Sequence, residues 1–94
     1  MFDARFTSPE ELHIEGRLDA AQIENAETTF SSIARSCTID CGALDYISSA
    51  GLGLFLKTQK RLKESGHSLR LMNLNKHMRD IFRYSGFDKL FEIL

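Results

Sequence analysis

The chain has 94 residues, of which 43% are hydrophobic, and this is enough for one domain with one core. Its 12 basic and 13 acidic residues give a formal net charge of -1, which argues against a nucleic-acid-binding protein, since those carry a clear basic excess. The N-terminus lacks the basic and apolar blocks of a signal peptide, and no apolar run approaches the roughly 18 residues of a membrane span. We expect a single cytoplasmic domain over residues 1–94, with no membrane insertion.

The N-terminal part of the chain predicts a hairpin followed by a helix. Residues 2–6 and 11–16 alternate apolar and polar side chains around a turn signal at residues 7–10, as in two antiparallel strands. Asp19 is the expected N-cap of the following helix, and Gln22 is placed to complete a capping box. The apolar stripe of this helix is expected to run over Ile23, Ala26, Phe30, Ile33 and Ala34, with an end near residues 35–36.

The rest of the chain alternates strands and helices. Residues 37–41 predict a short central strand that continues, extended or bent, to residue 47, and a helix follows from Ser49 to about Ser65. Its expected core stripe is Leu52, Phe55, Leu56, Gln59 and Leu62, which leaves Leu54 on the opposite side with Lys57 and Arg61. Residues 68–74 predict a strand, Asn75 caps a third helix with Met78, Ile81 and Phe82 inward, and residues 87–94 hold a short last strand.

This order, strand–strand–helix–strand–helix–strand–helix–strand, predicts an α/β fold. A hairpin followed by alternating strands and helices is typical of a mixed sheet whose parallel pairs are joined by right-handed crossovers. We expect four or five strands and about three helices.

The most informative stretch runs from Asp45 to Leu56. Gly51 and Gly53 stand in the first turn of the predicted helix, where each glycine weakens the helix by about 1 kcal/mol relative to alanine. A sequence that keeps two glycines beside Ser48 and Ser49 suggests a backbone left open for a partner. Leu54, predicted to point outward, is then a candidate contact.

Enzyme, nucleotide and metal sites do not fit this stretch or the rest of the chain. A nucleophile elbow needs glycine where Ile47 stands, and a dinucleotide-binding loop needs a third glycine where Leu56 stands. Cys37 and Cys41 are spaced as Cys-x3-Cys, without a second pair for zinc, so we expect them to be buried packing residues. We therefore expect no catalytic residue, no cofactor and no metal.

A serine at this corner has two possible roles. A hydroxyl at a helix N-cap accepts a hydrogen bond from a first-turn amide, so Ser49 could be a cap and nothing more. The alternative is a phosphoacceptor, since a phosphate adds about -1.5 to -2 charge, which the helix N-terminus tolerates while a docked partner does not.

Three motifs resemble the STAS domain of bacterial anti-sigma factor antagonists, and together they cover nearly the whole chain. They are Gly16-Arg17-Leu18-Asp19 at the strand-to-helix corner, Ile39-Asp40 with Leu44 to Gly53 at the central strand and loop, and Met78 to Phe87 in the last helix. The resemblance implies a non-enzymatic partner switch. In such systems the unmodified antagonist binds an anti-sigma factor that is also a serine kinase, phosphorylation ends binding, and a PP2C-type phosphatase reverses it.

The resemblance implies that Ser49 is the phosphorylated residue, with Ser48 as the less favoured alternative. Ser48 stands where the family often has aspartate, which leaves a second hydroxyl and removes a carboxylate beside the site. Residues expected at the partner-binding surface are Asp19, Ser48, Gly51, Gly53, Leu54, Lys57 and Arg61. A second form of the domain is a non-phosphorylated adaptor on the ATPase of a lipid-transport ABC complex; its loop resembles this one less.

Overall fold

The computed structural model describes residues 1–94 and has the predicted order of strands and helices. Its elements are β1 (Phe2–Ser8), β2 (Glu11–Leu18), the short 3-10 helix η1 (Ala20–Gln22), α1 (Ile23–Ser31), β3 (Cys37–Ile47), α2 (Ser49–Glu64), β4 (Leu69–Met72), α3 (Lys76–Ser85), the 3-10 helix η2 (Phe87–Lys89) and β5 (Glu92–Ile93). None of these helices combines the length and apolar character needed to cross a bilayer.

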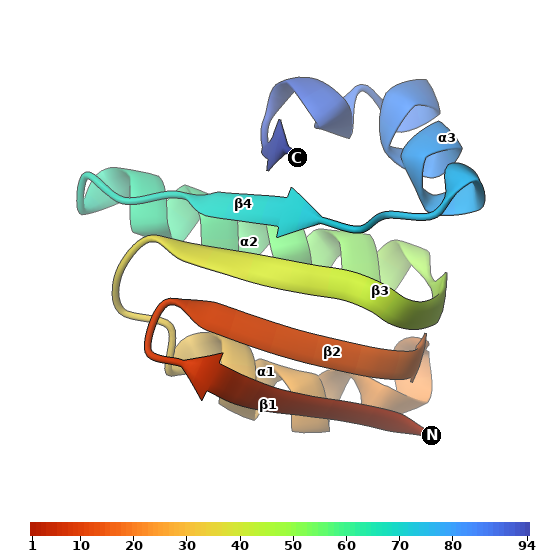
Figure 1. Ribbon diagram of the computed structural model, residues 1–94, viewed down its shortest axis with the longest axis horizontal. Helices are drawn as coiled ribbons and strands as arrows, with labels where there is room; N and C mark the ends of the chain where they lie inside the picture. Colours follow the sequence, from red (N-terminus) through yellow and green to blue (C-terminus); the bar gives the residue numbers. More distant parts are fainter.

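The five strands form one mixed sheet in the order β1-β2-β3-β4-β5. β1 and β2 are antiparallel and form the predicted hairpin, whereas β2, β3, β4 and β5 are parallel to one another. Figure 1 shows α1 and α2 behind the sheet, α3 beyond β4, and β1 at the free edge. Because β2 and β3 are parallel, their carboxyl ends meet at one end of the sheet, and this juxtaposition brings Leu18 beside Ile47.

The core lies between the sheet and the helices that cover one of its faces. Phe55 of α2 stands at its centre, with its ring centroid 5.4 Å from that of Phe30, 6.2 Å from Phe82 and 6.5 Å from Phe91. Aromatic pairs at these separations add stabilisation beyond their buried area, on the order of 1 kcal/mol each. Through Phe55, α2 therefore contacts α1, α3 and the segment that follows η2.

Two polar side chains fix the position of α2 further. The buried Gln59 amide accepts a hydrogen bond from the Leu69 backbone N–H at 2.7 Å and donates one to the Leu90 carbonyl at 2.7 Å. The Arg61 guanidinium donates to the carbonyls of Ile33 at 2.8 Å and Phe30 at 2.9 Å, beyond and at the end of α1. α2 is thus a rigid platform, and residues on its outer side are presented in a fixed orientation.

Some element boundaries differ from the prediction. The first helix starts as a 3-10 turn after Asp19 and α1 ends at Ser31, so Ile33 is buried from a loop while Ala34 is exposed. The poor helix formers at residues 28, 29, 31 and 32 explain this early end. The central strand continues without a break to Ile47, with two register shifts against β2 taking up the predicted bend. The last strand keeps only two residues, because η2 occupies the segment before it.

Cys41 makes the stability of the fold depend on pH in the alkaline range. Burial, with a smaller contribution from the negative charge of Asp40, raises the pKa of the Cys41 thiol to about 12. In the unfolded chain this thiol loses its proton near pH 8.5, so between these two values only the unfolded state is deprotonated. The free energy of unfolding should therefore fall as pH rises above about 9, by up to about 1.4 kcal/mol per pH unit.

Urea denaturation of the wild type and Cys41→Ala from pH 7 to 11 checks this prediction. The alanine variant is less stable at neutral pH because it leaves a small cavity, but it lacks the titrating group, so its deficit should narrow as pH rises. A deficit that stays constant over the whole range would contradict the predicted thiol pKa.

Candidate functional site

The candidate site begins where β3 passes into α2, at Ser48. The Ser48 amide donates to the Leu18 carbonyl at 2.9 Å, and its side-chain oxygen accepts from the Gly51 amide at 3.2 Å. Its backbone is extended, with φ -88° and ψ 172°, as at an N-cap. Ser48 is therefore the N-cap of α2, and the suggestion that Ser49 could be only a cap is wrong.

Ser49 is the first residue of the helix and has a different environment. Its side chain is exposed, and its hydroxyl makes no hydrogen bond within the protein. The amides of Ser49 and Ala50 also have no partner, as is usual for the first turn of a helix. The site therefore contains two adjacent hydroxyls, one occupied by the fold and one free at a helix N-terminus.

Gly51 and Gly53, both predicted to face a partner, have opposite environments. Gly51 is buried, and a Cβ placed there would lie 2.7 Å from Ile47 Cγ1 and 3.0 Å from the Leu18 carbonyl oxygen. The prediction that Gly51 is open to a partner is thus wrong, because the close approach is to the protein's own strands β2 and β3. Gly53 is exposed, and a Cβ there would have no atom within 4 Å.

This contrast predicts that alanine has opposite effects on stability at the two glycines. Gly53→Ala should raise the free energy of unfolding by up to about 1 kcal/mol, because alanine favours the helix and nothing obstructs its methyl group. Gly51→Ala should lower it by about 1–2 kcal/mol, because the helix gain is outweighed by the overpacking against Leu18 and Ile47. Urea denaturation measures both, and an increase in stability in both variants would contradict the packing assigned to Gly51.

Leu54 was predicted to be an exposed contact and is instead buried. Only 4% of its surface is accessible, and it belongs to the hydrophobic core. The buried side of α2 consists of Gly51, Leu54, Phe55, Thr58, Gln59 and Leu62. Thr58 fits there because its hydroxyl donates to the Leu54 carbonyl at 2.8 Å. A glycine and a threonine give no apolar signal, and without them the predicted stripe was rotated toward Leu52 and Leu56, which are half-buried.

Three charged residues of the predicted surface already have partners in the fold. Lys57 is exposed and its Nζ lies 3.4 Å from a carboxylate oxygen of Glu27 in α1. Arg61 is committed to the carbonyls near the end of α1, which limits the steering role expected of it. Asp19 caps η1 by accepting from the Ala21 amide at 3.1 Å, which confirms it as an N-cap; no hydrogen bond from Gln22 completes a box.

The outer side of α2 presents one continuous surface, which we call the α2 face: Ser49, Gly53, Leu56, Lys57 and Lys60. The spacing of these residues places them on one side of a helix. A shallow cavity of about 550 Å³ lies on this face and is lined in part by Gly53, Leu56 and Lys60. Leu56 was predicted to lie in the core stripe and is instead half-buried on this face, and Lys60 was not predicted to belong to it.

A second unpredicted feature at the same end of the sheet is a cation–π pair, Arg17 and Tyr46. They face each other across β2 and β3, and the Arg17 guanidinium lies 4.3 Å from the centre of the Tyr46 ring. Such cation–π contacts hold an exposed guanidinium in place. Only the strand register, which a sequence pattern does not give, would have revealed this pair.

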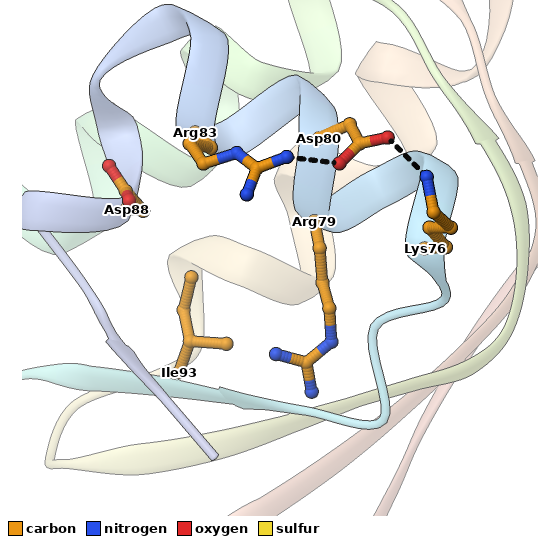
Figure 2. Close-up of a pocket in the computed structure, with 6 residues that line it drawn as sticks. All are labelled: Lys76, Arg79, Asp80, Arg83, Asp88 and Ile93. Atoms are coloured by element: carbon orange, nitrogen blue, oxygen red, sulfur yellow. Dashed lines mark hydrogen bonds and ion pairs between the residues drawn. The ribbon is translucent and has the colours of Figure 1, made fainter.

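A cavity of about 670 Å³ lies between α3 and the C-terminal segment. Figure 2 shows its charges pairing with one another: Asp80 contacts Lys76 at 3.3 Å and Arg83 at 2.9 Å. Arg79 donates to the Leu74 and Leu94 carbonyls. Since these cations are already engaged, the cavity is a weaker candidate for a ligand site than the α2 face is for a partner.

Sequence comparisons relate the chain to anti-sigma factor antagonists. A putative anti-sigma factor antagonist, BtrV of Bordetella bronchiseptica, is 39% identical over 74 residues, which make up 79% of this chain and 58% of that protein. The anti-sigma-B factor antagonist of Bacillus subtilis is 36% identical over 50 residues, which make up 53% of this chain and 46% of that protein. The matches thus span about half the length of each relative.

Solved structures show the same fold. The chain superposes on unphosphorylated SpoIIAA, an anti-sigma factor antagonist, with a TM-score of 0.79 at 21% identity, covering 100% of this chain and 88% of that one. It superposes on a STAS-domain anti-sigma-factor antagonist protein from Planctomyces limnophilus with a TM-score of 0.82 at 20% identity, covering 100% and 90%. The family model described as "Mlab, STAS domain" matches residues 4–94. Nearly the whole chain fits this model, which confirms the resemblance found in the sequence: the protein belongs to the STAS domain family.

Proposed function

We propose that this protein is an anti-sigma factor antagonist in a partner-switching pathway. In the proposal its unphosphorylated form binds an anti-sigma factor that is also a serine kinase, and phosphorylation at Ser49 ends that binding. A PP2C-type phosphatase removes the phosphate. The observation that carries the proposal is the difference between the two serines at the start of α2: Ser48 caps the helix, and Ser49 keeps a free, exposed hydroxyl.

The position of Ser49 suits phosphoryl transfer from a docked kinase. Its hydroxyl oxygen would attack the γ-phosphorus of ATP, ADP would leave, and a base of the kinase would take the hydroxyl proton. An exposed hydroxyl that makes no hydrogen bond can enter a kinase active site without breaking a contact of the fold. Ser48 is the poorer acceptor, because its oxygen is half-buried and accepts the Gly51 amide.

The phosphate would change the surface and leave the fold intact. It adds about -1.5 to -2 charge at pH 7, and the N-terminus of α2 favours an anion through its dipole and the unpaired amides of Ser49 and Ala50. A partner seated on the α2 face would instead meet added bulk and a charge that it must desolvate. The switch thus lies in the interface, with no conformational change required.

The partner is expected to be acidic where it meets the α2 face. Lys57 and Lys60 are exposed there, and only Lys57 has a carboxylate nearby. The half-buried Leu56 and the bare backbone at Gly53 would supply apolar contact between these charges and Ser49. Asp19 lies at the rim, at the carboxyl end of the neighbouring strand β2.

Affinity capture with purified chain as bait tests the partner. Unmodified protein should recover an anti-sigma factor with a serine-kinase domain from the source organism, and Ser49→Asp bait should lose it. Recovery of an ABC-type ATPase by both baits alike would overturn the proposal and favour the adaptor function that occurs elsewhere among STAS domains.

A further inference from the structure

The outer edge of β1 is an unpaired strand edge at the border of the sheet. β1 spans Phe2–Ser8 and pairs with β2 only, and Figure 1 shows no further strand along its other side, with α1 lying behind it. An edge strand of this length, with unpaired amides and carbonyls, is a template for pairing with another strand. Of the features that usually block such an edge, residues 2–6 have no proline, no bulge and no charge directed into the core, although Asp3 and Arg5 place charged side chains on the edge.

The sequence of this edge is complementary to itself. Residues 2–6 read Phe-Asp-Ala-Arg-Phe. A phenylalanine stands two residues to either side of Ala4, and the residues directly beside Ala4, Asp3 and Arg5, have opposite charges. When two copies pair antiparallel with Ala4 opposite Ala4, Asp3 of each copy faces Arg5 of the other. Phe2 of each copy then faces Phe6 of the other. We propose that β1 pairs with β1 of a second copy of this chain, in this register, to form a symmetric dimer with one continuous ten-stranded sheet.

Backbone geometry supports this register. The Arg17 amide donates to the Met1 carbonyl at 2.7 Å, and Phe2 lies opposite Gly16. Since antiparallel strands alternate between hydrogen-bonded and non-hydrogen-bonded pairs, Asp3 and Arg5 direct their backbone groups to β2, while Ala4 directs its own outward. Ala4 of the two copies would form a hydrogen-bonded pair. Asp3 and Arg5 would then face each other in the non-hydrogen-bonded sites, where side chains lie closest.

The side chains along β1 fit this pairing on both faces of the sheet. Asp3 and Arg5 lie on the open face with side chains 57% and 60% exposed. Within one chain Arg5 contacts Asp3 at 3.8 Å and Glu15 at 3.2 Å, so pairing across the edge would exchange the Asp3 contact for one between the two copies. On the helical face Phe2 and Ala4 are half-buried and Phe6 is 41% exposed. Pairing Phe6 with Phe2 of the second copy would cover it with an aromatic ring, a favourable cross-strand pair.

The helix next to this edge has a flank of short, uncharged side chains. The flank of α1 that faces α2 carries Glu27, which contacts Lys57. With 3.6 residues per turn, the opposite flank of α1 carries Asn25 and Thr29, whose side chains are short and uncharged. Two copies of α1 brought side by side would thus meet through these two residues, with Arg35 of the following loop beside Phe6. α2 packs against β3 and β4, which lie beyond β2 from this edge, so the dimer leaves the α2 face free.

Charge exchange tests the pairing directly by sedimentation equilibrium. Wild-type protein should shift from the 10.7 kDa chain mass toward twice that mass as concentration rises. Asp3→Arg and Arg5→Asp should each weaken dimerisation at least about tenfold, since each places like charges opposite one another. The double variant should recover the wild-type dimer. An equimolar mixture of the two single variants should form a heterodimer, because both of its ion pairs are restored.

Ala4→Pro supplies a backbone test. Its lost amide points outward, so the β1–β2 hairpin should survive, with an unchanged circular dichroism spectrum, while dimerisation is abolished. The proposal is overturned if wild-type protein keeps the monomer mass at concentrations near 1 mM. It is also overturned if the single variants dimerise as well as the wild type, or if the mixture and the double variant show no recovery.

Discussion

Ser49→Asp is expected to bind the partner at least about 30-fold more weakly than the wild type, while Ser49→Ala binds with unchanged affinity. The aspartate brings a negative charge to the rim of the α2 face, where a docked acidic partner would have to desolvate it, and such like-charge contacts in interfaces are worth several kcal/mol. Alanine removes only a hydroxyl that makes no contact within the fold. Isothermal titration calorimetry with the captured anti-sigma factor gives both affinities.

Ser48→Asp is the matched control for this pair. It adds the same charge one residue earlier, at a position whose side chain is turned to the Gly51 amide. Aspartate is as good an N-cap as serine, so stability should be retained. We expect this variant to bind within a few-fold of the wild type. If both aspartates weakened binding equally, charge at the corner in general would be the cause, and the assignment of the switch to Ser49 would fail.

Leu54→Ala is expected to lower the free energy of unfolding by about 2–5 kcal/mol, the usual range for a leucine deleted from a core. Leu54 is 4% exposed and packs in the main core cluster, so its loss leaves a cavity. Leu56→Ala, at a half-buried position on the same helix, should lower it by less than about 1.5 kcal/mol. Chemical denaturation of the two variants measures the difference.

The two substitutions are expected to have the opposite order of effect on partner binding: Leu56→Ala should affect it more than Leu54→Ala. Leu56→Ala removes an apolar contact from the α2 face, so it should weaken binding while the protein remains folded. Leu54→Ala should leave affinity unchanged under conditions where it is still folded, since its side chain does not reach the surface. Equal stability of both variants, or a loss of affinity only in Leu54→Ala, would contradict the orientation of α2.

The hairpin and the order of elements could be predicted because they depend on local patterns. Alternation on either side of the Pro9 turn fixes β1 and β2, and Asn75 was correctly predicted as the cap of α3, with its side chain accepting from the Met78 amide at 2.8 Å. The orientation of α2 could not be predicted from apolar spacing. It depends on Gly51 packing against Leu18, a contact between residues far apart in the sequence.

The candidate site divides in the same way. The stretch containing Ser48 and Ser49 was found from its composition, but which serine caps the helix depends on the direction of one side chain. Arg61 looked like a surface cation because its partners, the carbonyls of Phe30 and Ile33, come from another element. The roles of these residues depend on long-range contacts, and such contacts leave no periodic signal in the sequence.

Phosphate mapping after incubation with the cognate kinase and Mg²⁺-ATP tests the central claim most directly. Intact-mass and peptide mass spectrometry of the wild type, Ser48→Ala and Ser49→Ala should show one phosphate, on Ser49, in the first two proteins and none in the third. The phosphorylated wild type should no longer bind the kinase. Phosphate on Ser48 or another residue, or none from a kinase that binds the chain and is active, would contradict the account.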